Sequence, residues 1–563
     1  MAHLLEHMIF KGTTNLSESD INVVCQKLTG DANAFTSQDY TCYTFRLPSN
    51  AWQVGISILA ECMQNATFNP QMLSSELKAV IEELRLYRDD YQGVLVEQMI
   101  TSLFPEHPYR NSIIGTKADL CNLNRDDLYA FYKKHYHPRN AVLVVAGDVD
   151  TQQVFEVAER DFGYIPSPEH YEKEVFAFRM ISSRAAPRSI ARLMLPGFIT
   201  IGVWPINDKS RAKIEKIVEE ELALLCAHGV HDWEFTAAKK RTLVDFSSLL
   251  ESTERQAFVI GNSFVATRDE HFVEKYLAAV TATTKQDLID FFRRTFNQSQ
   301  VHKGYLLPIT KPEDMKTFVA LQAESDALET NILANHTRTL PVEQATWANT
   351  LTVPGLPSFS YPKPQTYACS NGMEIVYHNN QLVPQVVCLL SFKANHLYES
   401  DEQSGIIGFL LRVITDSSQS ADAQAFAQML ESEGISLGAS GDGIVIRCLS
   451  KDFEKALTIL SDLLLHPSLR IDSIEKTRQQ IISEIDELWD SPIDFIDQMA
   501  KELVYQSHPY HKNGLGSKES INRITKKDLE AIYRTFITPH ETVVVVVGDI
   551  GHVNLPERFA APL

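Results

Sequence analysis

The sequence lacks any apolar run long enough to cross a membrane, and none of its cysteines pair in a C-x-x-C motif. A membrane-spanning helix needs about 20 consecutive apolar residues, so we expect no transmembrane segment. The eight cysteines are scattered along 563 residues, which argues against a zinc knuckle or a disulfide framework. We therefore predict that they are small apolar residues of the protein interior.

Positive charge is also scarce, because 52 Lys and Arg residues stand against 72 Asp and Glu residues and give a net charge of −20. General binding to nucleic acid depends on clustered basic residues, so we expect no nucleic-acid partner. The length exceeds what one core can serve and predicts about three to four domains. The 44% of hydrophobic residues is enough to fill cores of that kind.

What the chain does have is an internal repeat, in which residues 107–149 match residues 508–550 at a constant offset of 401. Each copy begins with a loop rich in Pro and Gly, followed by an amphipathic helix at 126–134 or 527–535. A β-branched run ending in Gly-Asp follows, and it predicts a buried strand at 142–148 and 543–549. A constant offset over more than forty residues indicates a duplicated α+β domain.

The segments around the two copies differ from them in pattern. Residues 167–310 hold strand-like runs at 175–178 and 198–203, followed by long helical patterns. Residues 311–365 are polar and proline-rich, which predicts an interdomain linker. The first copy has no counterpart to the strand-like segment that opens the second copy, and the chain stops thirteen residues after Ile550. We therefore expect a chain that is truncated at both ends.

The most chemically loaded stretch is MAHLLEHMIF, at the start of the first copy. On a helix, His3, Glu6 and His7 share one face because they stand at positions i, i+3 and i+4. Two neutral imidazoles can hold zinc beside a carboxylate that acts on water. The alternative is an ordinary amphipathic helix on which these residues fell together. A third ligand is needed, and the long helical pattern at 74–91 offers candidate carboxylates.

That helical pattern carries three glutamates, of which Glu76 and Glu83 are seven residues apart and share a face, whereas Glu82 points elsewhere. At this point the sequence resembles the M16 (pitrilysin/insulinase) family of zinc metallopeptidases, to which the mitochondrial processing peptidase is related. The resemblance is carried by AHLLEHMIFKGT, GDANAFTSQDYTCYTFRLP, ELKAVIEEL and the repeated VLVVAGDV or VVVVGDI. The 76 residues between His7 and Glu83 match the family's spacing of its second and third ligands.

The resemblance implies a role for each residue of the motif. His3, His7 and Glu83 would bind one Zn²⁺, and Glu6 would be the catalytic general base for the water that attacks the scissile carbonyl. Glu76 would lie in the second shell and orient a ligand histidine.

The resemblance also implies a substrate-binding edge strand made of Asn33, Ala34, Phe35 and Thr36. Such a strand adds the substrate to the sheet through backbone hydrogen bonds, so the substrates would be extended, unfolded peptides. The alternative for these four residues is a plain strand and turn.

The fold that the resemblance implies is α+β, with tandem homologous α/β-sandwich domains of the LuxS/MPP-like metallohydrolase fold in an incomplete clamshell of two halves. The expected division is a catalytic domain at 1–166 that lacks its first strands, a shortened second domain at 167–310, a linker at 311–365, and an inactive domain of the second half at 366–563. A second copy of the chain, or a partner chain that supplies the missing domains, is the expected partner besides peptides.

The second copy serves as a control within the same chain, once a four-residue shift from the 401 offset is allowed. The site positions His3, Glu6, His7, Glu76 and Glu83 then correspond to Gly408, Leu411, Arg412, Thr477 and Glu484. The second copy cannot hold zinc through this set of residues. The sequence thus favours a zinc metalloendopeptidase of unfolded peptides, and the alternative is a non-catalytic M16-like peptide-binding or scaffold chain.

Overall fold

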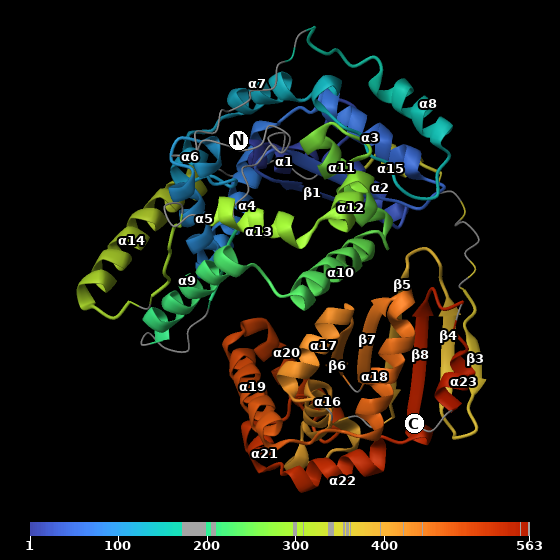
Figure 1. The fold of residues 1–563 in the computed structure, drawn as a ribbon. Helices are drawn as coiled ribbons and strands as arrows, with labels where there is room; N and C mark the ends of the chain where they lie inside the picture. Colours follow the sequence, from blue (N-terminus) through green and yellow to red (C-terminus); the bar gives the residue numbers. More distant parts are fainter. Residues whose placement is uncertain are drawn as a thin grey trace. The chain divides into compact units, whose positions relative to one another are not determined.

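The computed structural model describes most of the chain, in two compact units. The described residues are 1–169, 171, 199–203, 210–296, 301–307, 309–335, 343–352, 355, 360, 362–393, 396–419, 421–441, 443–551 and 553–560. Unit 1 comprises Met1–Ile214, Gln256–Val273 and Phe296–Phe359, and unit 2 comprises Glu215–Arg255, Glu274–Thr295 and Ser360–Leu563. Unit 1 holds the first copy of the repeat and unit 2 holds the second (Figure 1).

The first copy is built mainly of helices around one short hairpin. Its elements are α1 (Ala2–Ile9), α2 (Glu18–Lys27), β1 (Asp31–Thr36), β2 (Thr41–Arg46), α3 (Trp52–Asn65), α4 (Pro70–Asp89), α5 (Tyr91–Leu103), α6 (Lys117–Asn122), α7 (Arg125–His135) and α8 (Thr151–Phe162). β1 and β2 pair antiparallel, from Asp31 opposite Arg46 to Thr36 opposite Thr41. The core of this copy lies where α1 packs on α4, with Leu5, Met8 and Leu77 fully buried.

The second copy has the same helices and a larger sheet. Its elements are β3 (Gln365–Ala368), β4 (Glu374–Asn379), β5 (Gln385–Phe392), α16 (Ile406–Asp416), α17 (Ala423–Glu433), β6 (Ser436–Ser440), β7 (Gly443–Leu449), α18 (Phe453–Leu465), α19 (Ile471–Asp490), α20 (Pro492–Tyr505), α21 (Lys518–Arg523), α22 (Lys526–Phe536), β8 (Thr542–Gly548) and α23 (Leu555–Ala560). The sheet order is β3-β4-β8-β5-β7-β6, in which only β4 and β8 run parallel (Figure 1). Helices packed on this sheet make an α+β fold, as predicted.

The duplication is confirmed element by element. α4 and α19 begin 401 residues apart, as do α7 and α22, whereas α2 and α17, and β1 and β6, begin 405 residues apart. The offset changes in the hairpin, because β1 and β2 form one more residue pair than β6 and β7 and have a longer loop. Thr36 pairs with Thr41 across a four-residue loop, whereas Ser440 pairs with Gly443. The four-residue shift in the sequence is therefore this longer hairpin.

Two strand predictions are wrong. Residues 142–148 form no strand, although their counterpart β8 lies centrally between β4 and β5. The described part of the first copy contains no counterparts of β4 and β5, so this apolar run has no neighbours to pair with and Leu143 is 38% exposed. Residues 199–203 likewise form no strand, and Ile199 and Ile201 are exposed. The predicted strand at 175–178 lies outside the described residues.

The remaining described segments are helical. They are α9 (Arg211–His228), α10 (Asp232–Leu249), α11 (Thr253–Thr267), α12 (Phe272–Ala282), α13 (Lys285–Thr295), α14 (Pro312–Asn335) and α15 (Trp347–Thr350). α14 and α15 lie within the range predicted as a linker, and the four-part division at residues 166, 310 and 365 stays a prediction. No helix in the described ranges combines the length and apolar character that a membrane span requires.

Candidate metal centre

Helix α1 brings His3, Glu6 and His7 to the surface of the first copy's core. Its apolar residues Leu4, Leu5, Met8 and Ile9 are buried, which fixes the face that packs inward. His3 and His7 stand one turn apart beside that face, and their rings touch edge to face at 4.8 Å between centroids. The prediction that this stretch is a helix with the three polar residues on one side is confirmed.

Helix α4 supplies the carboxylates opposite α1. Its start is fixed by Pro70 and by the side chain of Asn69, which accepts a hydrogen bond from the Gln71 amide. Glu76 and Glu83 lie on the face turned to α1, two turns apart. Glu82 lies on the exposed side, where it pairs with Arg85 at 2.8 Å. The helical spacing thus separates the three glutamates as predicted.

His3, His7 and Glu83 converge on one point. Glu83 Oε2 lies 3.5 Å from His3 Nε2 and 3.3 Å from His7 Nε2, and the three ligand atoms lie within 4.8 Å of one another. Zinc bound at about 2.0–2.1 Å in a tetrahedron places its ligand atoms about 3.3 Å apart. The donor set and its spacing therefore fit zinc. Within the described ranges, this is the one group of three His, Cys, Asp or Glu residues with such spacing.

The carboxylate of Glu76 lies within hydrogen-bonding distance of the ring of His7. His7 Nδ1 lies 3.3 Å from Glu76 Oε2, so its Nε2 is left toward Glu83. Burial acts to raise the pKa of Glu76, but hydrogen bonds from His7 and Lys11 outweigh it and lower that pKa. Burial acts to lower the pKa of His7, but the Glu76 and Glu83 carboxylates outweigh burial, so that pKa is raised. His3 differs, because burial lowers its pKa and its buried Nδ1 has no hydrogen-bond partner among the described residues.

Glu6 is buried beside the histidines and receives one strong hydrogen bond. The hydroxyl of Thr36 donates to Glu6 Oε2 at 2.6 Å, and Thr36 Oγ1 lies 3.2 Å from Thr41 Oγ1. Burial raises the pKa of Glu6, and the Thr36 hydroxyl opposes part of that shift. The family resemblance implied only a backbone-recognition role for Thr36. The side-chain contact was missed, although the period-two pattern of β1 places Ala32, Ala34 and Thr36 on one face.

The predicted edge strand, Asn33 to Thr36, lies in β1. β1 pairs with β2 along one side, and its other edge has no partner strand in the described residues. Asn33 and Phe35 alternate outward, and the ring of Phe35 contacts those of Tyr40 and Phe258 at 5.8 and 5.5 Å. Because Thr36 touches Glu6, the open edge ends beside the candidate centre.

The second copy carries an ion pair at the corresponding point. Arg412 donates to both oxygens of Glu484, at 2.7 and 2.9 Å. These residues stand at the positions of His7 and Glu83. Leu411 at the position of Glu6 is fully buried, and Thr477 replaces Glu76. This copy has neither the imidazoles nor the base.

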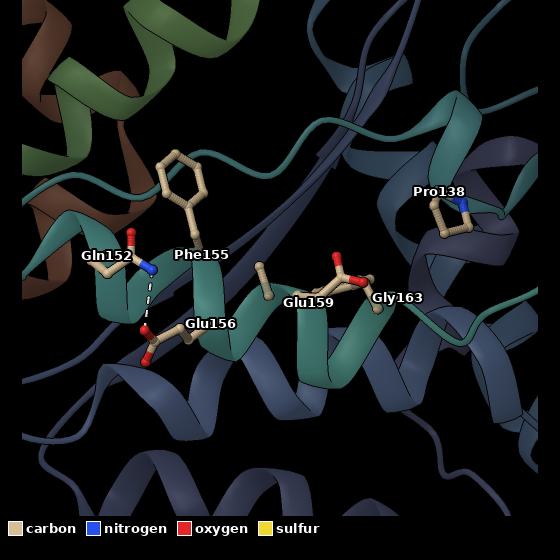
Figure 2. Close-up of a pocket in the computed structure, with 8 residues that line it drawn as sticks. Pro138, Gln152, Phe155, Glu156, Glu159 and Gly163 are labelled. Carbon is tan, nitrogen blue, oxygen red and sulfur yellow. Dashed lines mark hydrogen bonds between the residues drawn. The ribbon is translucent and has the colours of Figure 1, made fainter.

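A surface depression of about 730 Å³ lies elsewhere in the first copy, along α8 and beside Pro138 (Figure 2). Phe155 and Glu159 line it, and Gln152 bonds to Glu156 along the same helix at 3.1 Å. None of its lining residues belongs to the candidate metal centre, and we assign it no function.

Comparison with known proteins places both copies in one family. The model of the insulinase family, peptidase family M16, matches residues 1–117 and 374–517. A second model, the peptidase M16 inactive domain, matches residues 122–186.

Two curated relatives illustrate the sequence similarity. The mitochondrial-processing peptidase subunit beta of Blastocladiella emersonii is 31% identical over 166 residues, which cover 30% of this chain and 36% of that protein. An uncharacterized zinc protease of Rickettsia bellii is 31% identical over 169 residues, 30% of this chain and 41% of that protein. The chain thus matches about two fifths of the length of these relatives.

Two solved structures also align with the chain. The periplasmic protease PqqL from Escherichia coli aligns with 99% of this chain and 71% of its own, at 14% identity and a TM-score of 0.42. A peptidase M16 inactive domain from Pseudomonas fluorescens aligns with 35% of this chain and 49% of its own, at 22% identity and a TM-score of 0.33. Because the family matches together span more than half of the sequence, the chain belongs to the M16 (insulinase) family of zinc proteases.

Proposed function

We propose that this chain is a zinc-dependent metalloendopeptidase that hydrolyses peptide bonds in unfolded peptides, with one Zn²⁺ held by His3, His7 and Glu83. The observation that carries the proposal is the convergence of the two Nε2 atoms and Glu83 Oε2 at a spacing suited to zinc. When bound, the ion would supply a Lewis acid that polarises the scissile carbonyl and makes water easier to deprotonate.

Glu6 is the proposed general base. The Thr36 hydroxyl holds Glu6 Oε2, so Oε1 is the oxygen that accepts the proton of the attacking water. The same oxygen returns that proton to the leaving nitrogen. Because burial raises the pKa of Glu6, its carboxylate is a stronger base than that of an exposed glutamate, which suits it to this transfer.

The open edge of β1 is the proposed substrate-binding surface. A peptide strand that pairs with Asn33 to Thr36 would lie alongside the end of β1, where Thr36 contacts Glu6. Pairing of this kind uses backbone groups of both chains, so the substrate has to be extended. Folded proteins, whose strands are already paired, would not be cleaved.

The test combines zinc analysis with cleavage of a quenched peptide. We expect one zinc per chain in the wild type and in Glu6→Gln, with cleavage by Glu6→Gln reduced about 10²–10⁴-fold. Glu83→Gln should lose both zinc and cleavage. Glu82→Gln is the matched control, because Glu82 lies on the same helix but faces Arg85, and it should retain both.

Two results would contradict the proposal: a wild-type chain without zinc, or cleavage that is unaffected in Glu6→Gln. The alternative, a non-catalytic peptide-binding chain, predicts that unfolded peptides bind and that no Glu6-dependent cleavage occurs.

A further inference from the structure

Lys11 lies just beyond the end of α1, between two carboxylates. Its Nζ is 2.8 Å from Glu76 Oε1 and 2.9 Å from Glu18 Oε1, and all three side chains are largely buried. Charge-assisted hydrogen bonds of this length, in a partly buried place, are among the stronger polar contacts in proteins. Lys11 therefore anchors Glu76 to the start of α2.

The two oxygens of Glu76 have separate partners. Oε1 receives Lys11, and Oε2 receives Nδ1 of His7. With Oε1 fixed, the carboxylate cannot turn about its own side-chain bonds without breaking the contact with Lys11. The plane of the Glu76 carboxylate, and through it the ring of His7, is thus set by a lysine that touches neither His3, His7 nor Glu83.

This support matters more because His3 has none of its own. Its Nδ1 is buried without a hydrogen-bond partner among the described residues. Ligand histidines are usually oriented through the ring nitrogen that does not bind the metal. Of the two histidines, His7 is the one held in this way, so the orientation of the pair depends on Glu76.

In the second copy, the corresponding helices α16 and α19 pack together without the contacts that link His7, Glu76, Lys11 and Glu18 in the first. The positions of His7, Lys11, Glu18 and Glu76 are held there by Arg412, Asp416, Ala423 and Thr477. The inward-facing positions of α1 remain apolar and buried in α16, as Phe409, Leu410, Val413 and Ile414. All four polar residues thus changed together, while the packing face did not.

We infer that Lys11 is a positioning residue of the metal centre, which fixes Glu76 and thereby the ring of His7. The inference rests on the proposed zinc peptidase function and extends it to a residue outside the HLLEH motif. Lys11 contacts neither the substrate edge β1 nor Glu6 in the structure, so its effect should appear in metal binding and turnover, with no direct effect on peptide binding.

The experiment compares Lys11→Met with Lys11→Arg and with Lys78→Met, a control at a half-buried lysine two residues from Glu76 on α4. Affinity for zinc alone is measured by competition with a chromogenic chelator, and kcat and KM are measured at saturating zinc. For Lys11→Met we expect zinc affinity to fall about 10–100-fold, with kcat reduced and KM within about twofold of wild type. Lys11→Arg, whose guanidinium can reach both carboxylates, should restore most of the loss, and Lys78→Met should match wild type.

Wild-type zinc affinity and kcat in Lys11→Met would overturn the inference and leave the proposed function standing. A wild-type chain that binds no zinc would overturn both. Loss in Lys11→Met without rescue by Lys11→Arg, together with a lower melting temperature of the metal-free chain, would show a merely structural role and also overturn it. Should Lys11→Met fail to fold, Lys11→Gln keeps a donor of similar length and serves in the same comparison.

Discussion

The two copies share a helix pair but give the same partly exposed carboxylate different partners. In the first copy, Glu83 faces two imidazoles across gaps of 3.3 and 3.5 Å. In the second, Glu484 is already bound by both arms of Arg412. The guanidinium thus supplies from the chain itself the positive charge that a metal ion would supply in the first copy. Four differing side chains on a common framework, at the positions of His3, Glu6, His7 and Glu76, separate a site that fits zinc from a closed ion pair.

Arginine and histidine differ in what they offer to a neighbouring carboxylate. Arginine stays charged at any pH that a protein meets and presents a planar fork to a carboxylate. It therefore satisfies Glu484 permanently. An imidazole in its neutral form offers a lone pair instead, so the proposed cation would complete the set of His3, His7 and Glu83.

The largest effect is expected when the second copy's arginine is placed at the position of His7 in the first copy. His7→Arg should pair with Glu83 as Arg412 pairs with Glu484, so the chain should fold but bind no zinc. Peptide cleavage should fall by at least about 10³-fold, because loss of the ion and of a ligand removes several contributions to the transition state at once. Elemental analysis and the quenched-peptide assay measure the two effects. Retention of stoichiometric zinc in this variant would contradict the equivalence of the two positions.

The reverse substitutions, made in the second copy, test the same equivalence of positions. Gly408→His, Arg412→His and Thr477→Glu together would give the second copy the residues of the first, with Glu484 already in place. A Cβ at Gly408 makes only ordinary van der Waals contact, because it would lie 3.8 Å from the Gly514 carbonyl oxygen. We expect a second zinc per chain, bound about 10–100-fold more weakly than the first because Asp416 stands where Lys11 would support the new glutamate.

Cleavage should not increase in this triple variant, since Leu411 provides no general base. The matched control is Gly408→His alone, which should leave zinc at one per chain. A zinc content of one in the triple variant, measured on folded protein, would show that the framework around α16 and α19 differs from that around α1 and α4 in more than side chains.

The copies also differ in a buried, hydrogen-bonded position of their second helix, which is α2 in the first copy and α17 in the second. In the first copy, Asp20 is fully buried in α2 and accepts hydrogen bonds from the Ala348 and Ser17 amides and the Ser17 hydroxyl. At the corresponding position the second copy has Ala425. Asp20→Asn replaces one acceptor oxygen by a donor facing these N–H groups. It should lower the free energy of unfolding of unit 1 by about 2 kcal/mol at pH 7.

The loss of stability in Asp20→Asn should depend on pH. Burial acts to raise the pKa of Asp20, but the hydrogen bonds from Ala348 and Ser17 outweigh it and lower that pKa below the ordinary 3.8. Since the folded-state pKa is depressed, the stabilisation is complete above about pH 4 and is lost as the pH falls through the lower folded value. The difference in free energy of unfolding between wild type and Asp20→Asn should thus be constant near neutral pH and become smaller in acid. Urea unfolding over a pH series measures it, and a gap that widens in acid would contradict the assignment.

The helices of the site could be predicted from sequence because their information is local. The spacings of His3 to His7 and of Glu76 to Glu83 determine a shared helical face whatever the surroundings. The repeat added a register that tied α4 to α19 and exposed the missing ligands of the second copy. These features need no knowledge of distant contacts.

What could not be predicted depends on partners far away in the chain. The contact of Thr36 with Glu6, and of Lys11 with Glu76, arises only when separate elements pack. The pattern of the apolar run at 142–148 predicts a strand, but a strand forms only beside another, and the described first copy has no counterpart of β4 or β5. Likewise α14 formed within the expected linker, where its buried Glu329 pairs with Arg85 and Lys117.

The smallest expected effect comes from opening the ion pair of the second copy. Arg412→Met removes the two hydrogen bonds that Arg412 donates to Glu484. The side chains of Arg412 and Glu484 are 34% and 42% exposed, so water and salt screen this ion pair. The free energy of unfolding of unit 2 should fall by only about 0.5–1 kcal/mol. Zinc content and peptide cleavage should stay at wild-type values, because the proposed chemistry lies in the first copy. The result would complete the contrast with His7→Arg, in which the same pair of residue types is created and activity is lost. A drop in cleavage in Arg412→Met, with zinc retained, would instead mean that the second copy takes a direct part in the reaction.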